Sequence, residues 1–323
     1  MLGQQSQILW PAGEQTECGK NYSDMLPGMP TRANAKSRIA IVGAGNLANA
    51  LAVGLRRANY TIDEIVSRAS VASVKRARAL AREVRASAST IYRARLQAEI
   101  VWFCVPDREI AGTAELLSGA TDWHGKVALH SSGALTSDTL EVLRRRGAAV
   151  ASVHPLMTFV RDSRALPKGV PFALEGDPKA LRIARALVLQ LRGDPFTIHK
   201  RYKQAYHVWG MFLSPLFIAL LAAAERVAGA AGLSRHDTRK RMLPILRQTL
   251  TNYDRMGAAQ SFSGPIARGD VDTVSRHLEE LGRAPAAGEV YVALVRLAMR
   301  ELPVKNRAEF LKILGPAAGA RGK

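Results

Sequence analysis

The residue spacing most able to do chemistry in this chain is Gly-x-Gly-x-x-Ala, formed by Gly43, Gly45 and Ala48. Gly43 permits a tight turn, Gly45 lets the backbone approach a pyrophosphate, and Ala48 keeps the next helix close to the preceding strand. Free N–H groups at the start of that helix attract phosphate. The spacing therefore predicts a dinucleotide site. Its predicted cofactor-binding residues are Gly43, Ala44, Gly45, Asn46 and Leu47.

The next predicted strand, 64–67, indicates which dinucleotide binds. An acidic residue at the end of this strand binds the ribose 2′-hydroxyl of NAD, whereas an arginine nearby accommodates the 2′-phosphate of NADP. Asp63 and Glu64 lie at the start of the strand, while Ser67 and Arg68 lie at its tip. Because hydroxyls and a guanidinium suit a phosphate, Ser67 and Arg68 favour NADP over NAD. The alternative is that Arg68 is one of many surface arginines.

Residues at two further strand ends are expected to line the nicotinamide region. A cofactor in such a sheet lies across the carboxyl ends of the strands. Val105 and Pro106 close one predicted strand and Ser131 follows the next, so we predict that these three residues bind the cofactor. Cys104 is better explained as a small buried residue than as a nucleophile, because no partner base is evident.

Candidate proton donors and substrate-binding residues lie farther along the chain. Reduction of a carbonyl by hydride needs a proton donor beside the developing alkoxide. Lys203 and His207 are four residues apart on a predicted helix and share one face, so we expect them to be catalytic. We expect Ser132, His154 and Arg268 to position the substrate, since an arginine holds a carboxylate well. Each also has a structural alternative: a solvated lysine, a core or strand-end histidine, or a surface arginine paired with an acid.

The elements that must position these residues fall into two parts. Strands and helices alternate from residue 37 to 200, which predicts an α/β fold with a Rossmann-type, doubly wound parallel sheet. Strand signals vanish afterwards, so residues 201–315 are predicted to form an all-helical domain for substrate binding and dimerisation. Residues 1–36 are predicted to be a disordered extension, and 316–323 a tail. The predicted strands are 39–42, 64–67, 100–105, 127–130, 149–153, 171–175 and 195–199.

Charge and cysteine content bear on three possibilities: a nucleic-acid partner, a disulfide framework and a metal site. The formal charge of +19 could indicate a nucleic-acid partner. However, the arginines are scattered along helices without aromatic interleaving, so we expect no nucleic acid but a basic surface that attracts anionic substrates. Two cysteines and no Cys/His cluster predict neither a disulfide framework nor a metal site, which fits the cytoplasm.

The apolar stretch 204–224 raises the possibility of a membrane span. It contains no Asp, Glu, Lys or Arg and is long enough to cross a bilayer. Polar residues and Pro215 interrupt it, and a helix that is apolar on nearly all sides can equally be a core helix. We therefore expect no membrane association. The N-terminus lacks a basic stretch followed by an apolar core, so no signal peptide is predicted.

Together the motifs resemble the Rossmann-like proteins that carry a DUF2520 C-terminal domain. The resemblance covers about residues 37–315. It implies kinship with ketopantoate reductases, prephenate dehydrogenases, pyrroline-5-carboxylate reductases and 6-phosphogluconate dehydrogenases, which join a Rossmann domain to a helical one. The motifs are Gly43-Ala44-Gly45-Asn46-Leu47, Cys104-Val105-Pro106-Asp107, His130-Ser131-Ser132-Gly133, His154-Pro155-Leu156-Met157-Thr158-Phe159, Tyr206-His207 and Gly264-Pro265-Ile266-Ala267-Arg268-Gly269-Asp270.

The resemblance implies an NADPH-dependent oxidoreductase that acts on a carbonyl or hydroxyl group and dimerises through its helical domain. The expected substrate is a small 2-oxo acid, with ketopantoate as the first candidate. Two alternatives stay open: a prephenate- or imine-type NAD(P) dehydrogenase, and a non-catalytic NADP-binding sensor or partner protein. The second alternative rests on Ser214-Pro215, because the family helix usually reads Ser-Asn there.

Overall fold

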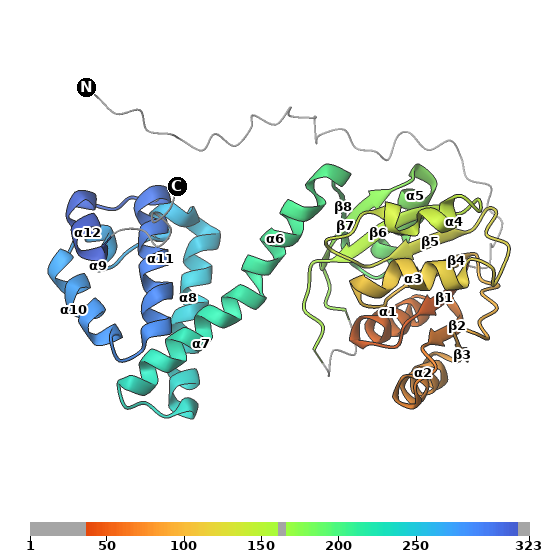
Figure 1. Ribbon diagram of the computed structural model, residues 1–323, viewed down its shortest axis with the longest axis horizontal. Helices are drawn as coiled ribbons and strands as arrows, with labels where there is room; N and C mark the ends of the chain where they lie inside the picture. Colours follow the sequence, from red (N-terminus) through yellow and green to blue (C-terminus); the bar gives the residue numbers. More distant parts are fainter. Residues whose placement is uncertain (1–36, 161–165, 316–323) are drawn as a thin grey trace, which may run out of the picture.

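A computed structural model of the chain describes residues 37–160 and 166–315. The predicted extension 1–36 and tail 316–323 lie outside the described residues. Figure 1 shows two parts, a sheet with its helices at one end and a group of helices at the other, joined by one long helical segment. This arrangement confirms the predicted fold class.

A single eight-stranded sheet has the order β3-β2-β1-β4-β5-β6-β7-β8. Neighbouring strands are parallel except for β6 and β7, so β7 and β8 run against the others. Parallel neighbours need a crossover connection, usually a helix, and the described part of the link between β6 and β7 contains none. The strands are β1 (Arg38–Val42), β2 (Thr61–Ser67), β3 (Ser87–Thr90), β4 (Ile100–Phe103), β5 (Val127–His130), β6 (Ala149–Pro155), β7 (Pro171–Gly176) and β8 (Asp194–Thr197).

Helices cover both faces of the sheet, as a doubly wound fold requires. Adjacent residues of a strand point to opposite faces: Trp102 packs into the cluster that includes Leu51 and Ala184, whereas Phe103 packs into the cluster that includes Ile110 and Leu143. The former cluster lies beneath α1, α2 and α5, and the latter beneath α3 and α4. These helices are α1 (Asn46–Arg57), α2 (Val71–Val84), α3 (Asp107–Leu117), α4 (Glu141–Arg144), which follows the 3-10 helix η2 (Ser137–Leu140), and α5 (Pro178–Gln190).

The described residues after β8 form helices only. The apolar stretch 204–224 does not form one continuous helix, because Ser214, just before Pro215, has a non-helical backbone. A proline lacks the N–H for the helical hydrogen bond and its ring clashes with the preceding turn, so the segment divides in two. The elements are η3 (Lys200–Tyr202), α6 (Lys203–Leu213), α7 (Pro215–Ala230), α8 (Arg235–Ser261), α9 (Pro265–Arg268), α10 (Val271–Leu281), α11 (Pro285–Glu301) and α12 (Arg307–Leu314).

The helical part buries little of its apolar surface. A small core of α10, α11 and α12 contains Val274, Val295 and Phe310. By contrast, α7 has no buried residue, although its sequence is strongly apolar. By length and composition Lys200–Ala230 could cross a membrane, and none of its most apolar window is buried. Within a single chain this segment is therefore not the core helix that its sequence allowed.

Candidate functional site

A crevice of about 710 Å³ opens at the carboxyl ends of β1, β2 and β4. The glycine turn after β1, the tip of β2 and the end of β4 all contribute to it, as the strand-end argument predicts. The predicted cofactor residues that line it are Gly43, Ala44, Gly45, Asn46, Ser67, Arg68, Val105 and Pro106. Leu47 instead packs against the core beneath α1.

The two glycines of the turn are needed for different structural reasons. Gly43 has φ +121°, and a Cβ there would lie 2.3 Å from the carbonyl oxygen of Cys104. At Gly45, nothing lies within 4 Å of an added Cβ, so this position opens toward the crevice. Gly45 is also the N-cap of α1 and supplies no side-chain cap, which leaves the first N–H groups available to an anion. This geometry can hold a pyrophosphate.

The crevice corner beside Ser67 contains charged residues besides the predicted Arg68, among them Glu109 and Arg76. Arg68 donates from Nη1 to Oε1 of Glu109 on α3 at 3.1 Å. Arg76 and Ser73 on α2 also line the crevice. The spacing of Ser70, Ser73 and Arg76 places them near one helix face, which is the sequence signal that could have indicated them.

The structure leaves Ser131 and Cys104 with structural contacts. The Ser131 hydroxyl accepts a hydrogen bond from the Trp102 indole at 2.8 Å, and Ser131 is not among the described residues that line the crevice. Burial raises the pKa of the Cys104 thiol to about 12, partly offset by a hydrogen bond with Ser131. A protonated thiol is a poor nucleophile, so Cys104 acts as a packing residue.

Ser132 is the centre of a buried polar group at the end of β5. Its hydroxyl donates to Oδ2 of Asp107 at 2.7 Å. Its carbonyl oxygen accepts from Nζ of Lys203 at 2.9 Å and from the Ser152 hydroxyl at 3.0 Å. These contacts fix the loop in place, and they bring two predicted site residues, Ser132 and Lys203, together.

Lys203, at the start of α6, is only 1% exposed. Burial lowers the pKa of Lys203 to about 8, although the charges of Glu175 and Asp107 oppose the shift. An ammonium with this pKa gives up its proton much more readily than an ordinary lysine. Its Nζ donates to the Ser132 carbonyl oxygen, so Lys203 also holds that loop in place.

His154 and His207 flank Gly133. A Cβ at Gly133 would lie 2.8 Å from Nε2 of His154 and 2.8 Å from Cδ2 of His207, so only glycine admits both rings. His154 Nδ1 is hydrogen-bonded to the Tyr206 hydroxyl at 2.8 Å. Burial, with the charges of Lys203 and His207 next, lowers the pKa of His154 to about 3, and the ring stays neutral. Tyr206 is thus a site residue without an assigned role in the sequence analysis.

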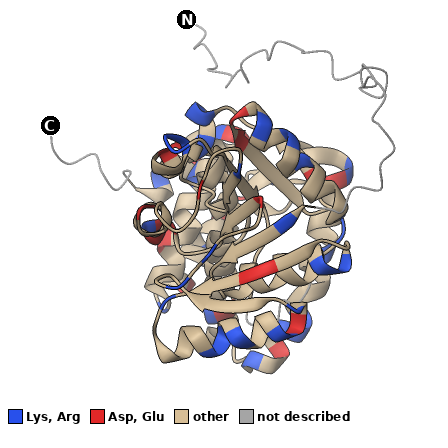
Figure 2. Ribbon diagram, turned by 90° about the vertical axis from the view of Figure 1, so that its right-hand side faces the viewer, with Lys and Arg blue, Asp and Glu red and all other residues tan. Residues whose placement is uncertain are grey.

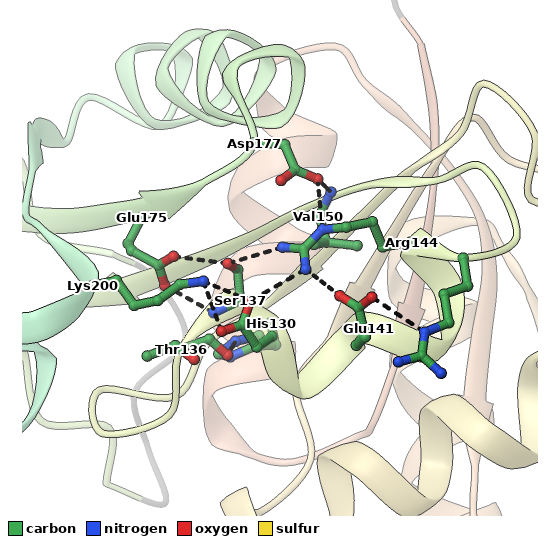
Figure 3. Close-up of polar contacts among 11 residues, drawn as sticks. His130, Thr136, Ser137, Glu141, Arg144, Val150, Glu175, Asp177 and Lys200 are labelled. Carbon is green, nitrogen blue, oxygen red and sulfur yellow. Dashed lines mark hydrogen bonds and ion pairs between the residues drawn. The ribbon is translucent and has the colours of Figure 1, made fainter.

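A second polar network fixes the segment that follows this loop (Figure 3). Ser137 donates from its backbone N and its hydroxyl to the Glu175 carboxylate, at 2.8 and 2.7 Å. Arg144 is paired with Asp177 and Asp138, each at 3.2 Å. Lys200 Nζ reaches the Asp138 carboxylate at 2.6 Å, which ties the start of the helical segment to the same loop.

Arg268 is not brought to this site within one chain. It ends α9, which lies in the helical group away from the sheet (Figure 1). Asp270 accepts hydrogen bonds from the backbone N and the hydroxyl of Thr273 and so caps α10. No ion pair between Asp270 and Arg268 is found among the described residues.

Lysines and arginines are spread over many elements of the sheet domain. On the face seen in Figure 2 they alternate with Asp and Glu rather than gathering in one stripe. A nucleic-acid surface usually concentrates its cations along a helix or one face. The face seen in Figure 2 does not show such a concentration.

Comparison with known families matches both parts of the chain. A Rossmann-like domain is matched over residues 27–155, and the domain of unknown function DUF2520 over residues 170–298. The second match begins before β7, so it includes the last two strands as well as most of the helices. No curated protein matches the sequence.

Solved structures share the fold. A provisionally named NADP oxidoreductase of Bacteroides fragilis has a TM-score of 0.68 at 22% identity, covering 80% of this chain and 96% of its own. An imine reductase of Pseudomonas sp. gives 0.57 at 23%, covering 87% and 100%. A reductive aminase of Aspergillus terreus, in complex with NADPH and ethyl-5-oxohexanoate, gives 0.58 at 16%, covering 82% and 94%. The chain therefore consists of a Rossmann-like N-terminal domain and a DUF2520 C-terminal domain, as its motifs predicted.

Proposed function

We propose that the protein is an NADP(H)-dependent oxidoreductase that reduces a small 2-oxo acid, with ketopantoate as the first candidate. The observation that carries the proposal is the crevice at the strand ends, where the Gly43 turn and the uncapped start of α1 can hold a pyrophosphate. Ser67 and Arg68 at its corner suit a 2′-phosphate. A fold relative that holds NADPH supports this choice.

The excess of basic residues over the whole chain, a formal charge of +19, favours an anionic substrate. Close to Lys203 the balance is different, because the carboxylates of Glu175 and Asp107 raise its pKa and offset its charge. Ser132 and Ser137 donate hydrogen bonds to these carboxylates without cancelling their charge.

In the proposed reaction the reduced nicotinamide supplies the hydride, and the chain supplies a proton to the developing alkoxide. Lys203 is the proposed proton source, because its pKa of about 8 lies near neutral pH. His207 supports it. Ser132 and His154 position the substrate, and Tyr206 holds the His154 ring through Nδ1.

A homodimer through the helical domain is part of the proposal. Large apolar side chains project from α6 and α7, among them Phe212, 64% exposed, and Ile218, 61% exposed. Contiguous apolar surface of this kind marks an interaction site. A second copy that covers it could also bring its own Arg268 toward the crevice, where the arginine would hold a substrate carboxylate.

Two other functions have specific support. The imine reductase and reductive aminase among the fold relatives favour an imine-type dehydrogenase. Pro215, in place of the usual family Asn, favours a non-catalytic NADP-binding protein.

One experiment separates the three functions. The purified protein is incubated with NADPH and a panel of 2-oxo acids and cyclic imines, or with NADP and prephenate, and the absorbance of the reduced cofactor is followed. Turnover of a 2-oxo acid that is lost in Lys203→Ala supports the proposal, whereas turnover of only an imine or prephenate supports the second function. NADPH binding without turnover supports the third, and failure to bind any dinucleotide refutes all three.

A further inference from the structure

The crevice corner contains two arginines in unequal electrostatic situations. Arg68, from the β2–α2 loop, lies against Glu109 of α3 on the other side of the crevice, with Nη1 and Oε1 3.1 Å apart. Arg108 Nε is also 3.9 Å from the same Glu109 carboxylate oxygen. The carboxylate therefore offsets part of the charge that Arg68 presents to a ligand.

Arg76 has no such counter-ion among the described residues. Its Nη2 donates to the hydroxyl of Ser73 at 3.4 Å, and Ser73 in turn accepts from the Ser70 hydroxyl at 2.9 Å. Hydroxyls are neutral, so they orient the guanidinium without cancelling its charge. Arg76 keeps most of its five N–H donors for a ligand.

The face of α2 that carries Arg76 is the one that lines the crevice. Ser73, Arg76 and Leu80 lie on this face together with Glu83. Glu83 is seven residues from Arg76, which is roughly 10 Å along a helix and about one Debye length at moderate ionic strength. Its carboxylate therefore does not neutralise Arg76 as Glu109 neutralises Arg68.

We infer that Arg76 determines the preference for a phosphorylated ribose, and that Glu109 weakens the contribution of Arg68 to that preference. This inference rests on the proposed dinucleotide site and adds to it the residues that discriminate the 2′-phosphate from the 2′-hydroxyl. The phosphate receives a charge-assisted contact from Arg76, whose charge has no competing carboxylate. Arg68 contributes fully to phosphate affinity only when its ion pair with Glu109 is broken.

Binding of NADPH and NADH to the full chain tests the inference through the fluorescence of the bound reduced nicotinamide. Arg76→Ala is expected to raise the Kd for NADPH about tenfold or more, the usual scale for one charged hydrogen bond, and to leave the Kd for NADH nearly unchanged. Glu109→Gln is expected to lower the Kd for NADPH. The double variant is expected to recover part of the affinity lost in Arg76→Ala, because Arg68 is then unopposed.

Arg78→Ala is the matched control. Arg78 lies on the same helix, but it lines a different groove, between α2 and β3, so this variant is expected to bind NADPH as the wild type does. If the wild type prefers NADPH and Arg76→Ala keeps that preference, the inference is wrong while the dinucleotide site stands. A tighter NADPH complex of Arg76→Ala, or a weaker one of Glu109→Gln, also overturns it. A wild type that binds neither dinucleotide overturns the proposed function itself.

Discussion

Lys203 Nζ donates a hydrogen bond to the carbonyl oxygen of Ser132 at 2.9 Å, across 71 positions of the sequence. The contact joins the start of the helical segment to the loop at the end of β5. Lys200 and Gln204 reach the same loop, at Asp138 and Ala134. The first turn of α6 is therefore fixed to the sheet domain, beside the crevice.

Because Lys203 is buried, it makes stability depend on pH. Its pKa is lowered from 10.5 to about 8, chiefly by burial. Between these values the unfolded chain keeps a proton that the folded chain has lost, so stability increases with pH across the window, by up to about 3 kcal/mol. Below the window both states are protonated and the burial penalty is complete. Urea unfolding of the wild type and of Lys203→Met, on either side of the window, measures this increase in the free energy of unfolding. The same pH dependence in both proteins would contradict the prediction.

Substitutions at the two glycines of the turn are expected to have different effects, one on stability and the other on cofactor binding. Gly43→Ala places a Cβ 2.3 Å from the Cys104 carbonyl oxygen at a position with a positive φ. The free energy of unfolding should therefore fall by about 1–3 kcal/mol. Gly45→Ala meets no atom within 4 Å, so the fold is kept while the approach of a pyrophosphate is obstructed. Thermal unfolding and NADPH titration of both variants separate these effects. Equal thermal stability of the two variants would contradict the prediction.

Tyr206 is expected to orient His154 for the reaction. Tyr206→Phe removes the hydroxyl that lies 2.8 Å from Nδ1, leaving the ring free to turn. The loss of one hydrogen bond should cost about 1 kcal/mol of stability, and misorientation should lower kcat by about tenfold to a hundredfold. Tyr202→Phe, on the exposed Tyr202 of η3, is the control. An unchanged kcat in Tyr206→Phe would remove Tyr206 from the site.

The exposed face of α6 and α7 is expected to be a dimer interface. Phe212→Glu places a charge on this face and should shift the protein from dimer to monomer in light scattering coupled to size-exclusion chromatography. Leu116→Glu, at a residue of similar exposure on α3, should leave the dimer intact. A monomeric wild type, or one that partitions into lipid vesicles, would refute the dimer and favour a membrane contact for this face.

Arg268 is expected to act on the crevice of a second copy. Arg268→Ala should raise KM for the substrate more than it lowers kcat, because the arginine binds a carboxylate rather than transferring a proton. Mixing Arg268→Ala with Lys203→Ala should regain activity, since a mixed dimer contains one site with both residues intact. No recovery after proven subunit exchange would place Arg268 outside the site.

Much of the fold follows from local patterns in the sequence. Most strands contain an apolar run, although β8 (Asp194–Thr197) does not. The glycine turn predicts the strand, the helix and the crevice between them. The strand β3 was missed because Ser87–Thr90 is a polar edge strand without a hydrophobic run. The reversal of β7 was missed as well, because the direction of a strand depends on how its connection packs.

The site was predictable in part for the same reason. Ser132, His154, Lys203 and His207 meet at the sheet, as their motifs suggest. The pair Arg68–Glu109 spans 41 positions and depends on how the loop after β2 faces α3. The contact of Tyr206 with His154 likewise needs the packing of α6 against β6, which no local pattern specifies.

The break at Ser214 and Pro215 separates two mechanical units. Lys203 and Tyr206 precede the break and are anchored on the sheet domain, whereas α7 and the later helices follow it. A rotation at Ser214 would reorient the whole helical group while the lysine, the tyrosine and His154 kept their mutual distances. The hydrogen bonds of Lys203 to Ser132 and of Tyr206 to His154 would survive such a rotation, because neither of them crosses the break.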